Sequence, residues 1–138
     1  MRLSVKLKHL VERELDFIVQ LAEKRLTKEN TREDRATKKT EESQFRNLQN
    51  IASATDSILV LENFLRYQMG RRYIDEKVGN QILEDIKTLK EKAEEIAKQE
   101  GLGEGDEFRA FLMEFVRLYL GFFVRALKAE EKGGDANA

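Results

Sequence analysis

Apolar residues recur at intervals of three and four along most of this chain, which is the spacing of side chains on one face of an α-helix. The strongest example starts at Ser43 and ends near Arg72, and it predicts one uninterrupted helix. Ser43 can cap its start with its hydroxyl, and Gly70 can end it in a left-handed conformation. The pattern predicts an all-α bundle of four main helices, open to further division: residues 3–26, 43–72, 75–99 and 107–130.

The last of these helices, preceded by Asp106 as its cap, is apolar around more than half of its circumference. Such a helix needs partners on several sides, so we expect it at the centre of the bundle or also against another subunit. Arg117 interrupts its apolar surface. Because an unpaired buried guanidinium costs on the order of several kcal/mol, Arg117 should pair with Glu114 at the bundle edge or meet an anion supplied from outside.

Two segments are predicted to lie outside the packed helices of the single domain, residues 1–130. Residues 27–42 contain one apolar residue, Ala36, and their charges balance, so they read as a mobile linker after the first helix. A second interpretation is a loop ordered by a polyanion, with Lys38 and Lys39 as contacts. Residues 131–138 are small and polar, and we expect a disordered tail there.

Composition limits the classes of function. The chain has no proline and no cysteine, which favours helix and fits the reducing cytoplasm. Residues 110–124 are the most apolar run, but they are too short for a membrane span and contain two charged side chains. The formal net charge of −1 predicts that any nucleic-acid binding comes from a local patch. Eight acidic side chains against five lysines in residues 75–100 make the third helix a poor place for that patch.

Candidate catalytic chemistry is sparse. The only histidine, His9, lies in a segment that predicts a surface position, and nothing pairs with it as a base or a metal ligand. The glycine-rich residues 101–105 lack the lysine and the preceding strand of a phosphate-binding loop, so they predict a turn. We therefore expect a protein without catalytic residues, metal or cofactor. Carboxylate-only metal chemistry stays open as an alternative.

Arginines gather on the two helices that are richest in aromatic residues. The guanidinium fork matches phosphate geometry, and Tyr67 and Tyr73 could stack on exposed bases. The alternative is that these arginines pair with the acidic third helix and lie over the core with no ligand. The set consists of Arg46, Arg66, Arg71, Arg72, Arg109, Arg117 and Arg125.

Three short motifs resemble the Csm small-subunit family of type III-A CRISPR effector complexes. Residues 43–46 are similar to its Ser-Gln-apolar-Arg opening, and residues 65–71 to its Tyr-x-x-Gly-Arg ending of the same helix. Residues 108–123 resemble its closing helix, with Met-Glu between aromatics. One departure is Leu120, where the family often has histidine after a tyrosine. A small subunit of a neighbouring CRISPR effector type is therefore a further alternative.

The resemblance implies a helical, noncatalytic, cytoplasmic subunit, stacked in several copies beside the other subunits of the complex. It would contact the backbone of the crRNA–target RNA duplex, with no role at a membrane. The other alternative is a homodimeric helical scaffold without RNA binding, held together by the aromatic fourth helix. Gly70 would allow close backbone approach. The implied phosphate contacts are Arg46, Arg66, Arg71 and Arg117 first, and Arg72, Arg109, Lys38 and Lys39 second.

Overall fold

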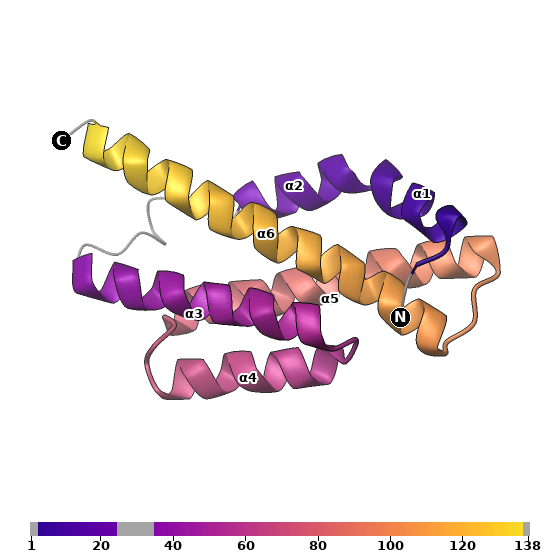
Figure 1. Ribbon diagram of the computed structural model, residues 1–138, viewed down its shortest axis with the longest axis horizontal. Coiled ribbons are helices and arrows are strands. Elements are labelled where there is room, and N and C mark those ends of the chain that lie inside the picture. Colours follow the sequence, from indigo (N-terminus) through magenta and orange to yellow (C-terminus); the bar gives the residue numbers. More distant parts are fainter. Residues whose placement is uncertain (1–2, 25–34, 137–138) are drawn as a thin grey trace.

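The computed structural model describes residues 3–24 and 35–136, and within them every regular element is an α-helix (Figure 1). Side chains are described for residues 3–24 and 42–129. The prediction of an all-α fold is confirmed, but two of the four predicted helices are divided. The helices are α1 (Val5–Arg13), α2 (Leu15–Lys24), α3 (Arg35–Ala54), α4 (Ile58–Gly70), α5 (Glu76–Glu100) and α6 (Asp106–Ala136).

The first predicted helix breaks at Glu14, where the chain bends between α1 and α2. Ser4 caps α1, because its hydroxyl accepts a hydrogen bond from the Leu7 N–H at 3.2 Å. Both short helices bury their apolar stripes, and both pack against α6. Because of this bend, the apolar faces of both α1 and α2 lie against the long helix α6. No glycine or proline marks it, so the pattern alone missed it.

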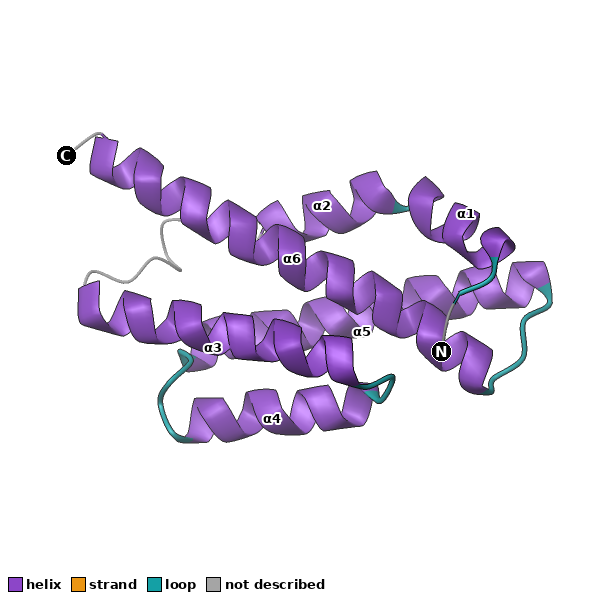
Figure 2. Ribbon diagram, viewed as in Figure 1, coloured by secondary structure: helices purple, strands orange, loops and turns teal. Residues whose placement is uncertain are grey.

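The prediction of one helix over residues 43–72 is wrong. The chain forms an antiparallel hairpin of α3 and α4, joined by the short turn of residues 55–57 (Figure 2). Ser57 caps α4 by accepting from the Val60 N–H at 3.3 Å, and its own N–H donates to the Thr55 hydroxyl at 3.0 Å. Such side chains compete with helical hydrogen bonding, which ends α3 here. Ser43, the predicted cap, lies inside α3.

The boundaries of α3 and α6 correct the predicted linker and tail. Helix α3 begins at Arg35, so the second half of the linker segment is helical, and residues 25–34 lie outside the described part. Lys38 and Lys39 are on this first part of α3, where side chains are not described. Helix α6 begins at Asp106 itself and continues to Ala136, well into the segment for which disorder was expected.

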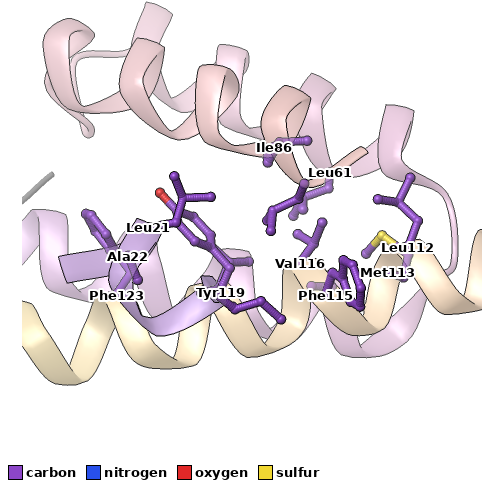
Figure 3. Packing of buried hydrophobic residues seen from close by; sticks show 14 of the residues in the cluster. Leu21, Ala22, Leu61, Ile86, Leu112, Met113, Phe115, Val116, Tyr119 and Phe123 are labelled. Atoms are coloured by element: carbon purple, nitrogen blue, oxygen red, sulfur yellow. The ribbon is translucent and has the colours of Figure 1, made fainter. Parts of the chain in front are cut away.

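Helix α6 is the central helix, as its apolar circumference predicted. It packs against α1, α2, α3 and α5, and its phenylalanines fill the space between them (Figure 3). Phe123 meets Phe45 of α3 edge to face, with ring centroids 5.2 Å apart. These aromatic side chains are buried within their own chain. The alternative of a dimer built on the apolar face of α6 therefore lacks a free face at Phe111, Phe115 and Phe123.

One polar pair lies inside this core. Asp85 of α5 and Tyr119 of α6 are both fully buried, and the Tyr119 hydroxyl donates to Asp85 Oδ2 at 2.5 Å. The hydrogen bond offsets part of the cost of removing both groups from water. It also ties the acidic helix to the central one. The pattern of charges on α5 gave no sign that one of its carboxylates points inward.

Candidate nucleic-acid interface

The C-terminal end of α4 has an unusual backbone. Arg72 has a φ of 63°, in the left-handed region, whereas Gly70 is an ordinary helical residue. The Arg72 N–H donates to Met69 O at 3.0 Å, and the Tyr73 N–H donates to Gln68 O at 2.9 Å. These two hydrogen bonds define a Schellman motif whose left-handed position is normally glycine. The prediction that Gly70 ends the helix in this way is wrong, and an arginine is placed there instead.

This turn brings two tyrosines around Arg71. Its guanidinium carbon lies 4.3 Å from the centre of the Tyr73 ring and 5.2 Å from that of Tyr67. Nη2 donates to the Tyr73 hydroxyl at 2.9 Å, and Nη1 donates to the Tyr67 hydroxyl at 3.3 Å. The tyrosines, predicted to stack on bases, therefore hold the guanidinium by cation–π contact and hydrogen bonds.

Arg66 and Arg72 flank this arrangement, and both are exposed. Arg66 lines a groove of about 460 Å³ between α4 and α5, together with Glu62 and two lysines of α5. Within the described part of the chain, neither Arg66, Arg71 nor Arg72 forms an ion pair with a carboxylate. We call Arg66, Tyr67, Arg71, Arg72 and Tyr73 the α4 arginine cluster.

The two lysines in this groove are residues that sequence reasoning missed. Lys87 and Lys90 belong to α5, the acidic helix that was set aside as a poor candidate for nucleic acid. They stand three positions apart, so they share the face of α5 that borders α4. Their spacing was visible in the sequence, but only the packing of α5 beside α4 shows that they join Arg66.

Arg46 is placed on the same hairpin. Arg46 lies in α3, ten positions before Asp56 of the turn, and Arg66 lies in α4, ten positions after Asp56. An antiparallel hairpin therefore places the two arginines at a similar distance from the turn along the helix axes. The Arg46 side chain is 64% exposed and pairs with Glu42 at 3.0 Å. Lys128 of α6 contacts the same carboxylate at 3.0 Å. Arg46 is therefore accessible, but its charge is partly neutralised by Glu42 of the same chain.

Arg117 is engaged within the fold. Its Nε donates to Ala52 O at 2.6 Å, and its Nη2 donates to Thr55 O at 3.1 Å and to Asp56 Oδ1 at 2.8 Å. The predicted pair with Glu114 is also present, at 3.4 Å. The hydrogen bond from Arg117 holds the pKa of the Asp56 carboxyl below its ordinary value, against the opposing effect of burial. Arg117 closes the end of α3 and fixes the turn, so it is not presented to an outside phosphate.

The remaining predicted contacts are dispersed. Arg109 is exposed near the start of α6 and pairs with Asp106, one turn earlier on the same helix. Arg125 lies over the ring of Phe122 on α6. The ion pairs of Arg46, Arg109 and Arg117 thus go to α3, to α6 and to the α3–α4 turn, not to the acidic α5 that the alternative interpretation expected.

Comparisons with protein-family models, with curated proteins and with solved structures gave no match. In residues 3–24 and 35–136, no group of three histidine, cysteine or acidic residues is arranged to hold a metal ion. Over the same ranges, no helix combines the length and the apolar character that crossing a membrane requires. His9 is on the surface of α1.

Proposed function

We propose that this protein is a noncatalytic small subunit of a type III-A CRISPR effector complex, and that it contacts the backbone of the crRNA–target RNA duplex through the α4 arginine cluster. The observation that carries the proposal is the setting of Arg71. This side chain is oriented by two tyrosines and has no carboxylate to neutralise it among the described residues.

The donor count of Arg71 favours phosphate as its ligand. A guanidinium has five N–H donors in a planar fork, and the two tyrosine hydroxyls use two of them. The remaining donors can form paired, charge-assisted hydrogen bonds with phosphate oxygens. Because the rings already restrict the side chain, less rotamer entropy is lost when the ligand binds.

The hairpin adds a second argument. In an uninterrupted helix, Arg46 and Arg71 would stand about 37 Å apart at 1.5 Å per residue. The antiparallel arrangement of α3 and α4 brings two of the three motifs that resemble the Csm small subunit onto one side-by-side pair of helices (Figure 1), whereas the resemblance places them at the two ends of one helix. We keep Arg46, Arg66, Arg71 and Arg72 as proposed contacts, and we assign Arg117 to positioning of the hairpin.

The small number of contacts fits a subunit that works in several copies. With three or four phosphate contacts, the logarithm of affinity should fall by about 0.7 to 0.9 per contact for each logarithm of salt concentration. A single copy would then bind free RNA weakly at physiological salt. Copies stacked along one assembly, beside the other subunits in the cytoplasm, would recover affinity through effective concentration.

The test is RNA retention by a reconstituted effector complex that carries Arg71→Glu in every copy of this subunit. We expect target RNA to bind at least about tenfold more weakly at about 150 mM salt, with a shallower salt dependence. Arg13→Glu, an equivalent charge reversal at an exposed position of α1, is the matched control and should leave binding unchanged. Equal retention by both variants would remove the RNA role and leave the homodimeric scaffold.

A small subunit of a neighbouring CRISPR effector type has the same geometry in its favour. Subunits that co-purify with the tagged protein distinguish the two, because the type III-A assignment requires the Csm backbone subunits and a guide RNA. Guide RNA recovered with a different set of subunits would transfer the proposal to that effector type.

A further inference from the structure

The outer side of α4 exposes apolar side chains. In the described part of the chain, the large hydrophobic residues with the greatest exposure are Leu59 at 72%, Val5 at 71%, Tyr67 at 57% and Val60 at 51%. Three of these four belong to α4, a helix that lies at the edge of the bundle (Figure 1). Helix α4 packs on α3 and α5 with its other side. Burying the exposed side chains against a partner would be favourable.

Two of these side chains, Leu59 and Tyr67, are arranged symmetrically about one residue, Asn63. Leu59, Asn63 and Tyr67 are spaced four apart, so they form a line along one face of α4. A two-fold axis at Asn63 would bring Leu59 of one copy onto Tyr67 of another, and the reverse. Asn63 would meet its own equivalent, and a side-chain amide can both donate to and accept from a second amide. A two-fold contact requires this self-complementary arrangement.

The charges beside the line have the same symmetry. Glu62 precedes Asn63 and Arg66 follows it, on the edge of α4 that borders the groove with α5. In the antiparallel pairing, Glu62 of one copy falls within about 3 Å along the axis of Arg66 of the other. Neither residue forms an ion pair within the described part of its own chain. The pairing would therefore create two equivalent intermolecular ion pairs.

We propose that the outer face of α4 is a self-association surface whose partner is the antiparallel α4 of a second copy of this chain. A helix of 13 residues is about 20 Å long, so the contact falls at the small, transient end of protein interfaces. A dissociation constant between about 10 and about 500 µM is expected for a contact of this size. Arg66 and Tyr67 belong also to the α4 arginine cluster, but the inference does not rest on RNA binding.

Sedimentation equilibrium of the purified, RNA-free chain from about 5 to about 500 µM tests the contact, because this range spans the expected dissociation constant. Wild-type protein should show a monomer–dimer equilibrium, and Leu59→Ser should weaken it at least about tenfold. Val5→Ser removes an equally exposed hydrophobic residue from α1 and is the matched control. Monomer throughout this range, or equal weakening by both substitutions, would overturn the proposal.

A charge exchange gives a second test that does not depend on loss of a contact. Glu62→Arg and Arg66→Glu should each weaken self-association at least about threefold, because like charges would face each other. A mixture of the two variants should form mixed dimers, since the arginine introduced in the first variant would face the glutamate introduced in the second. Failure of the mixture to associate better than either variant alone would contradict an antiparallel pairing about Asn63.

Discussion

Two arginines beside the same hairpin have opposite surroundings. Arg117 reaches the α3–α4 turn, where its donors go to main-chain carbonyls and to carboxylates of its own fold. Arg71 is at the far end of α4, where two tyrosine rings and hydroxyls hold it, with no carboxylate among the described residues. The donors of the first side chain are used within the fold, whereas the two tyrosine hydroxyls use only two of the five donors of the second. Helical periodicity did not separate them, because the oxygens that hold Arg117 at the turn lie more than 60 residues away in the sequence.

The largest expected effect is on the stability of the hairpin. Arg117→Ala removes the side-chain donor from two main-chain carbonyls and one of the partners of Asp56, and should lower the free energy of unfolding by about 2–4 kcal/mol. Arg71→Ala removes only exposed contacts, so its loss should stay within about 0.5 kcal/mol. Urea denaturation monitored by circular dichroism measures both. Similar losses of unfolding free energy for the two variants would contradict the proposed difference between the surroundings of Arg117 and Arg71.

The pH dependence of stability tests the ion pair between Arg117 and Asp56, and its expected effect on the free energy of unfolding is smaller than that of Arg117→Ala. The pKa of Asp56 is lowered in the folded state, so this carboxylate adds stability that is complete above its ordinary, unfolded pKa. That stability is lost as the pH falls through the lowered value. The advantage of wild type over Asp56→Asn should therefore shrink below about pH 4, by at most about 1 kcal/mol after solvent screening.

Urea midpoints from about pH 3 to about pH 7, which spans the ordinary pKa of an aspartate, give this measurement. Asp106→Asn is the control for an exposed carboxylate that also pairs with an arginine. A gap between wild type and Asp56→Asn that widens toward the acid end of this range would reverse the sign of the predicted effect.

A comparably small effect is the gain of stability expected from a substitution at the end of α4. Arg72→Gly relieves the cost of a left-handed conformation in a residue with a Cβ, in part offset by the greater freedom of glycine in the unfolded chain. The net gain should be about 0.5–1 kcal/mol, whereas Arg72→Ala, which keeps the conformation, should give none. Thermal unfolding of both variants compares them. A loss of stability in Arg72→Gly would mean that the arginine side chain itself supports the turn.

Much of the fold was predictable, because apolar periodicity reports helices and their buried faces directly. Helices α5 and α6 follow the predicted segments closely at their starts, and the central place of α6 follows from its apolar circumference. The break at residues 55–57 was not predictable in this way. Its sequence carries no glycine or proline, and the contact that fixes it comes from Arg117, more than 60 residues later.

The candidate site was predicted in its residue types rather than its geometry. Arginines and tyrosines near position 70 were recognised, and Arg66, Arg71 and Arg72 are exposed in the structure. The enclosure of Arg71 by Tyr67 and Tyr73 was not foreseen, because it depends on the left-handed backbone of Arg72. Such a conformation is rare for arginine, so local propensity argues against it.

Two of the hydrogen bonds by which Arg117 holds the turn go to peptide oxygens, those of Ala52 and Thr55. Every amino acid offers such an oxygen, so the chain around the turn can drift in composition while its course is retained. The course of the chain at the turn then depends on one distant residue of α6, Arg117. A substitution of Arg117 would thus alter the position of the arginines of α4, although Arg117 does not contact them.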